Sequence, residues 1–333
     1  MKRRRGAVLV TGGAGYVGSF TVRALAARGE EVVVLDDLSR GHREALPEGV
    51  PLVRGRVQDR AKVRRLLRSR PFDTILHFAA FAYVGESMGD PALYWENNVG
   101  GTTALLSEAE AAGGAGFVLS SSCTVYGTPK GARIPETAPR NPVNPYGCTK
   151  AACEMLLENL AEAGRMRSFR LRYFNAAGGA ADGSLGEHHD PEAHLLPLAL
   201  LAAERGTALR VFGTDWPTAD GTCVRDYVHV EDLADAHAAA VDRLRAGSPG
   251  GALNLGTGQG ASVLDVAAAA EAVTGRRVRL KNGPRREGDT AIAVAGAGQA
   301  EAILGWKPRY GGIESILATA WEWHRRHPRG FGR

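Results

Sequence analysis

The sequence predicts an α/β protein with a doubly wound parallel sheet and a smaller C-terminal α/β domain that holds the substrate. Short apolar runs alternate with helical patterns through the first half of the chain, and the first run leads into a glycine-rich turn. After residue 176 the elements become shorter. Strands that alternate with helices in this way build parallel βαβ units. We expect two domains, residues 1–175 and residues 176–333, with some segments interleaved.

Composition narrows the classes of protein that this chain can belong to. A chain of 333 residues, with 44% hydrophobic and 23% charged residues, is typical of a soluble globular protein with one large or two joined domains. No apolar run approaches the roughly 20 residues of a membrane span, and the basic start lacks the apolar segment of a signal peptide. The net charge of +5 is modest and the arginines are scattered. We therefore expect a cytoplasmic protein without a membrane or nucleic-acid partner.

The glycine-rich turn after the first apolar run predicts a dinucleotide site. Residues 7–10 form the run, and Gly13-x-Gly15-x-x-Gly18 follows, before a helical pattern that reaches residue 27. Glycines permit the tight turn and the close approach of a pyrophosphate, which then lies at the start of the helix. Gly12, Gly15 and Gly18 form a second three-residue spacing in the same turn. This context predicts a Rossmann-type domain.

Two carboxylates after the second predicted strand indicate which dinucleotide is bound. Residues 31–35 form this strand, and Asp36 and Asp37 follow it. A carboxylate there would accept hydrogen bonds from a ribose diol and would repel a 2′-phosphate. The pattern therefore favours NAD over NADP.

The remaining alternation predicts where polar residues gather. Further strands are expected at residues 52–54, 74–78, 117–120 and 169–173, with helices at residues 59–68 and 91–112. Ligands in such sheets bind at the carboxyl ends of the strands. Three segments fall there: the run His77, Phe78, Ala79 and Ala80, the triplet from Ser120 to Ser122, and the run from Arg172 to Asn175.

Tyr146 and Lys150 form a candidate proton-transfer pair. Asn144-Pro145 predicts a helix that starts just after the proline and runs to residue 160, which places the two side chains on one face. A free phenol has a pKa of about 10, but a nearby ammonium favours its phenolate. A hydroxyl at a strand end, such as that of Ser122, can relay a proton between phenol and substrate.

Neither the histidine-rich run near residue 188 nor the four cysteines have the spacing of a metal site. The run Glu187-His188-His189-Asp190, with His194 close behind, lacks the spacing of a helical His-x-x-x-His pair and has no cysteine beside it. We therefore interpret it as a polar substrate loop and expect no metal. The four cysteines also lack metal-type spacing, so reduced thiols are expected.

Arginines in the second half suit a diphosphate ligand. Arg225-Asp226-Tyr227 and the run Arg-Arg-Glu-Gly-Asp at residues 285–289 come from distant segments. Planar guanidinium groups bind phosphate oxygens in pairs. Phe212 could belong to the core or stack on a base. Helices are also predicted at residues 262–273 and 313–324.

Taken in order, these motifs resemble those of the UDP-galactose (UDP-glucose) 4-epimerases, a family within the extended short-chain dehydrogenase/reductases. The resemblance covers nearly the whole chain, from about Val8 to His327. It rests on the glycine turn, Ser-Ser-Ser-Cys-Thr-Val-Tyr at residues 120–126, Tyr-Gly-x-Thr-Lys at 146–150, Arg-Tyr-Phe-Asn at 172–175 and Arg-Arg-Glu-Gly-Asp at 285–289. The string Thr-Ala-Asp-Gly-Thr-Cys-Val-Arg-Asp-Tyr at residues 218–227 is the most specific of them.

The resemblance implies a mechanism. Tyr146 would remove the proton of the sugar 4-OH, Ser122 would assist, and Lys150 would lower the pKa of Tyr146 while holding the nicotinamide ribose. A hydride would pass from sugar C4 to NAD and leave a 4-keto intermediate. The intermediate would turn and receive the hydride on its other face, so that no NAD is consumed.

The resemblance implies a homodimer that forms through the helices around residues 91–112 and 146–163. The resemblance and the motifs together also predict which residues bind the cofactor and the substrate. The predicted cofactor residues are Gly12, Gly15, Tyr16, Val17, Gly18, Asp36, Asp37, Phe78, Ala79, Ala80, Asn97, Ser120, Tyr146, Lys150 and Tyr173. The predicted UDP-sugar residues are Ser122, Tyr146, Asn175, His194, Leu195, Phe212, Arg225, Tyr227, Arg286, Asp289 and Ala293.

Three positions depart from the better-known bacterial pattern. Arg56 stands where an aspartate usually contacts the adenine, and Ala82 stands at a lysine position near the cofactor phosphates. Ala293 replaces a tyrosine of narrow-specificity members. A small residue there should leave room for a 2-acetamido group, so UDP-GlcNAc and UDP-GalNAc are expected substrates besides UDP-Glc and UDP-Gal.

Other functions are compatible with parts of the pattern. A sugar-nucleotide dehydratase or decarboxylase would use the same tyrosine, lysine and NAD, but dehydratases of this type carry an Asp-Glu pair where this chain has Cys123-Thr124. An epimerase for UDP-pentoses or uronic acids stays open. A non-catalytic NAD-binding protein would be expected to lose the tyrosine or lysine, and both are present.

Overall fold

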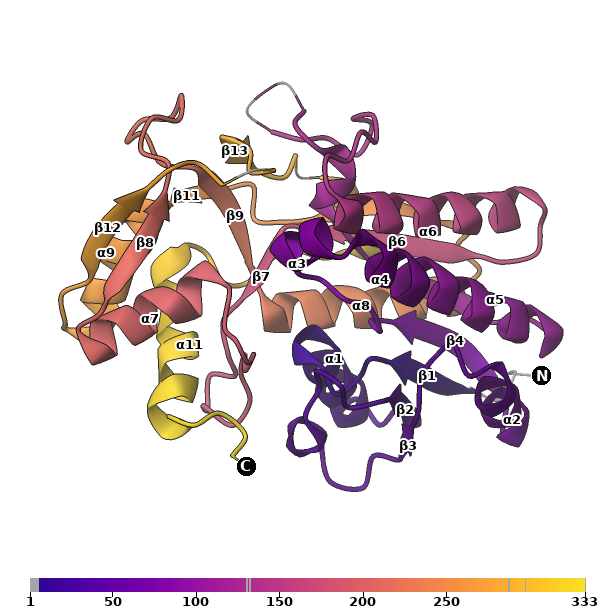
Figure 1. The fold of residues 1–333 in the computed structure, drawn as a ribbon. Helices are drawn as coiled ribbons and strands as arrows, with labels where there is room; N and C mark the ends of the chain where they lie inside the picture. Colours follow the sequence, from indigo (N-terminus) through magenta and orange to yellow (C-terminus); the bar gives the residue numbers. More distant parts are fainter. Residues whose placement is uncertain (1–5, 130, 132, 287, 297, 333) are drawn as a thin grey trace.

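The computed structural model describes residues 6–129, 131, 133–286, 288–296 and 298–332, and its main feature is a parallel sheet (Figure 1). Within these residues the sheet has seven strands, in the order β10-β6-β5-β4-β1-β2-β3. The strands are β1 (Ala7–Thr11), β2 (Val32–Asp36), β3 (Leu52–Arg54), β4 (Phe72–His77), β5 (Gly116–Ser122), β6 (Ser168–Tyr173) and β10 (Gly250–Leu255). All the pairings are parallel, which confirms the predicted fold class.

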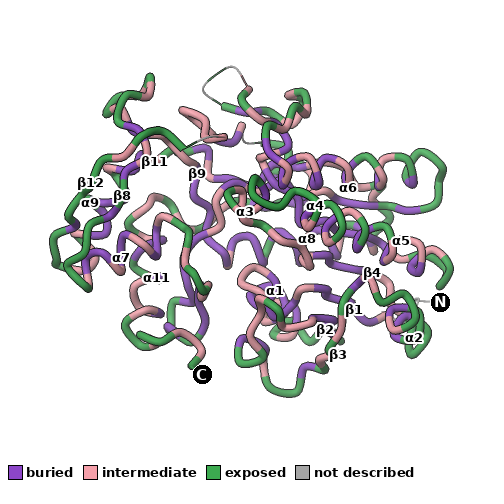
Figure 2. The backbone as a smooth tube through the Cα atoms, in the orientation of Figure 1, coloured by how far each residue is buried: buried purple, intermediate pink, exposed green. Residues whose placement is uncertain are grey.

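Both faces of this sheet are covered by helices. Along β1, Val8 and Val10 pack with α1 (Tyr16–Ala27) and α8 (Val230–Arg245) on one face. Leu9, which points the other way, packs with α2 (Arg60–Ser69), α5 (Gly101–Ala111) and α6 (Pro145–Glu162). Strands buried on both faces are mostly apolar, and in β1 and β2 only the last residues, Thr11 and Asp36, are polar. Every residue of both strands is buried (Figure 2).

The order of the strands positions the site. The chain runs from β1 outward to β3, then crosses back to β4 on the other side of β1. In a doubly wound sheet the crevice at such a reversal is where ligands bind, outside the carboxyl ends of the strands. The glycine turn follows β1 and Phe78 follows β4, so this edge brings the two together.

The described part of the second half contains two smaller sheets. β9 (Val224–His229) pairs with β7 (Asn175–Ala177), β11 (Gly260–Ser262) and β13 (Ile292–Ala293), and β8 (Ala208–Phe212) pairs with β12 (Arg279–Gly283). A separate apolar core joins α7 (Leu195–Arg205), α9 (Val263–Thr274) and α11 (Ile313–Arg326). α10 (Gln299–Leu304) is a short helix that contacts β10 and α8.

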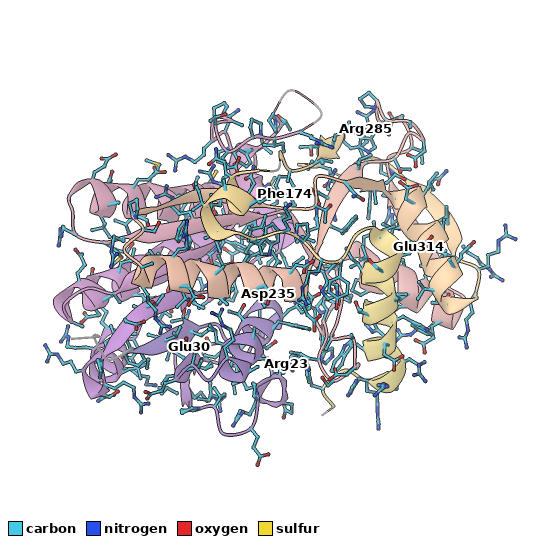
Figure 3. All side chains as sticks on the ribbon, turned by 180° about the vertical axis from the view of Figure 1, so that it is seen from behind. Arg23, Glu30, Phe174, Asp235, Arg285 and Glu314 are labelled. Atoms are coloured by element: carbon cyan, nitrogen blue, oxygen red, sulfur yellow. The ribbon has the colours of Figure 1, made fainter. Side chains whose placement is uncertain are left out.

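The two halves of the chain are interleaved in the main sheet. β10 and α8 lie after residue 175 in the sequence, yet both pack on the sheet that begins with β1. Seen from behind, α8 with Asp235 crosses the back of the molecule, and Phe174 lies where the two halves meet (Figure 3). The domain boundary at residue 175 stays a prediction.

Most predicted elements occur within a few residues of their expected positions. The helix expected at residues 91–112 is divided into α4 (Pro91–Tyr94), a π-helical turn (Trp95–Gly100) and α5, and the short helix α3 (Val84–Gly89) precedes it. Short 3₁₀ helices lie at Arg43–Ala45 and Cys123–Tyr126. Among the described residues, none of the helices combines the length and apolarity required to cross a membrane.

Candidate active site

Tyr146 lies at the start of α6, where local sequence fixes the helix. The Asn144 side chain accepts a hydrogen bond from Gly147 N at 2.8 Å, and Pro145 occupies the first helical position. Tyr146 and Ser122 are both buried, although Ser122 comes from the end of β5. The Tyr94 ring, which the sequence did not indicate, packs edge-on against Tyr146, with centroids 6.4 Å apart.

Lys150 reaches the same place from one turn further along α6. Its Nζ donates to the Ser120 carbonyl at 2.6 Å and lies 5.8 Å from the centre of the Tyr146 ring. Only 3% of Lys150 is exposed, and burial lowers its pKa to about 8, against the opposing effects of Cys153 and Glu154. The structure thus brings together the three residues predicted to carry the chemistry.

In the protein without bound NAD, burial favours the neutral form of the Tyr146 phenol. Burial raises the pKa of Tyr146 well above its usual value, the neighbouring Tyr173 adds to this, and a hydrogen bond with Ser122 opposes it. Both shifts follow the same physical rule, because a water-poor site disfavours the phenolate and the ammonium alike. The expected lowering of the pKa of Tyr146 by Lys150 stays a prediction.

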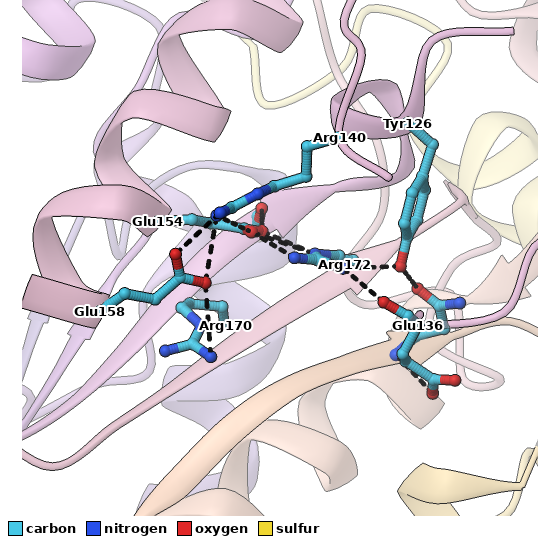
Figure 4. Close-up of polar contacts among 9 residues, drawn as sticks. Tyr126, Glu136, Arg140, Glu154, Glu158, Arg170 and Arg172 are labelled. Atoms are coloured by element: carbon cyan, nitrogen blue, oxygen red, sulfur yellow. Dashed lines mark hydrogen bonds and ion pairs between the residues drawn. The ribbon is translucent and has the colours of Figure 1, made fainter. Parts of the chain in front are cut away.

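A buried charge network anchors the helix that carries Tyr146 and Lys150 (Figure 4). Glu154 is fully buried and pairs with Arg172 of β6, whose Nη2 lies 2.5 Å from Glu154 Oε2. The hydroxyl of Ser121 on β5 donates to Glu154 Oε1, also at 2.5 Å. Arg172 further donates to the Tyr126 hydroxyl at 2.8 Å. One carboxylate therefore ties α6 to both strands that end at the site.

The glycine turn packs so closely on the neighbouring backbone that Gly12 and Gly18 have no room for a side chain. Gly12 has a φ of +70°, and a Cβ there would lie 2.4 Å from Ala79 N. A Cβ at Gly18 would lie 2.2 Å from Gly12 O, so the start of α1 packs tightly on the turn. Gly15, at the N-cap of α1, has only Gly12 O near its Cβ position, at 3.4 Å. The backbone of Tyr16 and Val17 opens the helix beside it. The cradle fits a dinucleotide pyrophosphate.

The predicted ribose carboxylate is oriented by the backbone. Asp36 accepts hydrogen bonds from Ala14 N at 2.9 Å and Leu38 N at 2.8 Å. Burial raises the pKa of Asp36, and these two N–H groups oppose that rise. Arg56 is half-exposed, and its Nε lies 3.9 Å from Asp37 Oδ2. Arg56 therefore faces the predicted adenosine end with its charge partly balanced by Asp37.

Other predicted cofactor residues line the same edge of the sheet. Phe78 packs on His237, and Ala79 N donates to Thr11 O at 3.1 Å. Ala80 and Ala82 follow in the partly exposed loop after β4. Tyr173 and Ser120 hydrogen-bond through their hydroxyls. Asn97, on the π-helical turn, accepts hydrogen bonds from Gln58.

The predicted nucleotide residues form a second group on β9 and the segment before β13. Arg225 Nη1 donates to Thr290 O at 2.7 Å, and its Nη2 lies 3.5 Å from Asp289 Oδ1. Arg286 also pairs with Asp289, at 3.2 Å, and its guanidinium lies 5.4 Å from the centre of the Phe212 ring. Ala293 is paired with Arg225 across β13 and β9. These distant segments therefore meet, as the prediction required.

Two predicted substrate residues connect this group with the main sheet. Asn175 Nδ2 donates to Asp226 O at 3.0 Å, which joins β7 to β9. Tyr227 is buried in the apolar core of the second half.

Burial raises the pKa of the Cys123 thiol to about 12, and the charge of Arg225 opposes this rise. Cys123, next to Ser122, therefore lies within electrostatic reach of the nucleotide residues.

His194 and Leu195 begin α7 and bring an unpredicted group together. His194 Nδ1 pairs with Glu187, and His189 and Glu192 lie beside them. Burial raises the pKa of Glu187, but His194 and His189 together hold it at about 2. Glu192 had no sequence signal, because the spacing of helical ligand pairs does not connect it with this run. The nearby Tyr83 ring packs on both histidines and had no sequence signal.

The sequence of the chain is similar to those of known proteins over nearly its whole length. The family model for the NAD dependent epimerase/dehydratase family matches residues 8–256. The chain belongs to this family. It is 46% identical to a UDP-glucose 4-epimerase of Lacticaseibacillus casei, over 98% of both chains.

Solved structures of this family superpose closely on the chain. A UDP-glucose 4-epimerase from Brucella ovis in complex with NAD matches with a TM-score of 0.91 and 43% identity, over 95% of this chain and 97% of that one. A UDP-glucose-4-epimerase from Stenotrophomonas maltophila with bound NAD and formylated UDP-arabinopyranose matches with a TM-score of 0.94 and 39% identity, over 98% and 99%. The resemblance predicted from the motifs is confirmed.

Proposed function

We propose that this protein is an NAD-dependent isomerase that interconverts UDP-glucose and UDP-galactose by inverting sugar C4 through a transient 4-keto intermediate. The observation that carries the proposal is the burial of Tyr146, Ser122 and Lys150 together, at the sheet edge that also carries the glycine turn. NAD, when bound, supplies the hydride acceptor. A coupled assay that detects UDP-glucose formed from UDP-galactose tests the proposal, and a lack of turnover by NAD-loaded protein would contradict it.

The side chains divide the proton chemistry among them. Tyr146 takes the proton of the 4-OH, and Ser122, which hydrogen-bonds with it, passes the proton between phenol and sugar oxygen. Because burial raises the pKa of Tyr146 and lowers that of Lys150, the phenolate forms only when further positive charge enters the site. The proposal therefore couples proton removal to occupation of the site by the oxidised cofactor.

The nucleotide group explains how an intermediate is retained. Arg225 and Arg286 share Asp289 as their partner, and a diphosphate can take the place of one of these contacts. Phe212 offers a ring face for the uracil beside Arg286. Binding through the UDP part leaves the sugar free to turn while Tyr146 and the cofactor stay in place. His194 and Leu195 would contact the sugar nucleotide at the start of α7.

Substrate breadth depends on Ala293. We propose that UDP-GlcNAc and UDP-GalNAc are also accepted, since Ala293 offers no ring in the position where narrow-specificity members carry tyrosine. A panel of UDP-hexoses, UDP-N-acetylhexosamines, UDP-pentoses and UDP-uronic acids tests this proposal. Turnover of the non-acetylated hexoses alone would reject it, and preferred turnover of pentoses would favour the second candidate function.

A homodimer is proposed through the outer surfaces of the helices around residues 91–112 and 146–163, the same helices that carry Tyr146, Lys150 and Asn97. Exposed apolar side chains lie on α3, the π-helical turn and α6, at Met88, Trp95 and Met155, and these elements contact one another. Exposed apolar residues grouped on adjacent helices are typical of a subunit interface. Light scattering should give twice the mass of the chain, and a monomeric mass would contradict the proposal. We further propose that the enzyme acts in the cytoplasm.

A further inference from the structure

The loop before α7 brings four ligand-type side chains to one point. We call them the His–Glu cluster: Glu187, His189, Glu192 and His194. Each offers one donor atom, and the four donor atoms lie within 4.8 Å of one another. Two are imidazole nitrogens and two are carboxylate oxygens, a donor set that suits divalent first-row transition metals.

The charges of this cluster are not balanced by lysine or arginine. The side chains of Glu187 and Glu192 are only 5% and 11% exposed. Within the described part of the chain, the ion pairs that these two carboxylates form are with His189 and His194 alone. Two nearly buried carboxylates need about two positive charges close by. A divalent cation would supply them without protonating either imidazole.

A buried nitrogen in the cluster lacks a hydrogen bond. His189 Nδ1 is inaccessible to solvent and has no hydrogen-bond partner among the described residues. Glu187 Oε1 is only 3.2 Å away, but the two atoms do not meet in hydrogen-bonding geometry. Buried polar atoms left unpaired in this way often mark an absent water or ion. His189 Nδ1 and Glu187 Oε1 lie close together without forming a hydrogen bond. This arrangement is expected where both atoms face a metal ion between them.

Three separations between ligand-type atoms, measured to one or the other oxygen of Glu192, lie close to those around a tetrahedral ion. His189 Nδ1 lies 3.2 Å from Glu187 Oε1 and 3.7 Å from Glu192 Oε2, and His194 Nδ1 lies 3.9 Å from Glu192 Oε1. Ligands about 2.0–2.2 Å from a tetrahedral Zn²⁺ are about 3.3–3.6 Å apart. His194 and Glu187, which hydrogen-bond directly, would have to separate as the ion enters.

The surrounding structure already orients these side chains. The backbone N–H groups of Ala193 and His194 both donate to Glu192 Oε1 at 2.8 Å. Trp323 of α11 donates to the Glu187 carbonyl at 3.0 Å. Secondary contacts of this kind hold the ligands of metal sites in place.

We propose that the His–Glu cluster is a structural site for a divalent transition metal ion of the Zn²⁺ class. The ion connects the glycine turn, on the predicted cofactor side, with His194 before α7, on the predicted substrate side. The His189 ring packs edge-on against Tyr16 of that turn. The Tyr83 ring packs on both His189 and His194. His194 immediately precedes Leu195, the first residue of α7. Metal binding itself does not depend on the proposed function.

The test uses the full chain after treatment with a chelator and desalting. Titration calorimetry with Zn²⁺ should show one equivalent bound. Glu187→Gln and His189→Gln should each weaken binding by more than about 100-fold. His188→Gln is the matched control, because His188 lies in the same loop but stacks on His42, outside the cluster. It should bind Zn²⁺ like the wild type.

Cobalt substitution identifies the ligands. Co²⁺ should give the visible absorption of a four-coordinate ion without the near-ultraviolet charge-transfer band of thiolate ligands, and His189→Gln should abolish it. Circular dichroism shows whether each variant folds, and Glu192→Gln replaces any variant that does not. The proposal is overturned if Zn²⁺ does not bind stoichiometrically, if the cluster variants bind like His188→Gln, or if the cobalt spectrum shows thiolate ligation.

Discussion

Lys150 and Arg286, two cations predicted to hold cofactor and substrate, lie in contrasting surroundings. Lys150 is 3% exposed, bonds to the Ser120 carbonyl, and sits one turn from the buried Glu154–Arg172 pair. The Arg286 side chain is 56% exposed and pairs with Asp289, three residues along the chain. The groups assigned to chemistry are thus fixed by the central sheet. The groups assigned to substrate binding have local partners that a ligand can replace.

The largest effect is expected when the hydroxyl of Tyr146, one of the groups fixed by the central sheet, is removed. Tyr146→Phe should reduce turnover by about 100- to 10,000-fold, the usual range for loss of a general acid–base group. The fold and NAD binding should persist, because the ring stays packed against Tyr94. Steady-state kinetics together with the dinucleotide content of the purified variant check this. Tyr310→Phe, which also removes a hydroxyl but outside the site, should keep wild-type turnover.

Breaking the buried pair should cost stability. Glu154→Gln leaves Arg172 without its charged partner and should lower the free energy of unfolding by about 3–5 kcal/mol. Chemical denaturation measures the loss. Glu158→Gln is the matched control, because Glu158 lies one turn further on, is 29% exposed and pairs with Arg140. Its cost should be about 1 kcal/mol or less. Equal costs for the two variants would refute the anchoring role of Glu154.

Loss of the exposed Arg286 should weaken substrate binding without lowering stability. Arg286→Gln should raise the KM for UDP-galactose about 10- to 100-fold, since hydrogen bonds to charged groups contribute about 1.5–3 kcal/mol, and should leave stability nearly unchanged. Arg285→Gln serves as the control, because Arg285 pairs with Asp215 and stacks on Trp216 instead. Figure 3 shows Arg285 at the outer rim of the second half. An unchanged KM in Arg286→Gln would remove Arg286 from the site.

The smallest expected effect is a pH dependence of the stability that Lys150 contributes to the fold. The pKa of Lys150 is about 8 in the folded protein, below its ordinary value, so the unfolded chain binds more protons above pH 8. The contribution of Lys150 to stability therefore rises by about 1 kcal/mol per pH unit above pH 8 and levels off at the ordinary lysine pKa. Denaturation of wild type and Lys150→Met, both without NAD, measures the difference between them at each pH. A difference that does not change with pH would contradict the assigned pKa.

Local patterns were sufficient to predict six of the seven strands of the main sheet and to select the candidate reacting residues. The apolar run before Gly12, the turn at Asn144-Pro145 and the spacing of Tyr146 and Lys150 are all local signals. Where a later segment packs is not local. No strand was predicted at residues 250–255, and no local pattern indicates that β10 completes the first sheet beside β6.

The His–Glu cluster shows the same limit at the level of side chains. Spacing rules for metal ligands assume a helix or a hairpin, whereas residues 187–194 form an irregular loop before α7. Glu187 reaches His194 only because the loop folds back against Trp323 of α11. Tyr83 and Tyr94 likewise became recognisable only in three dimensions, through their packing on His194 and Tyr146.

The central claim is that a hydride leaves sugar C4, stays within the buried site and returns to the same carbon. UDP-galactose that carries deuterium at C4 tests this most directly, with nuclear magnetic resonance of the UDP-glucose formed in ordinary water. The account predicts that deuterium is retained at C4 of the product, because the hydride never exchanges with solvent. Loss of the label to water during conversion would contradict it.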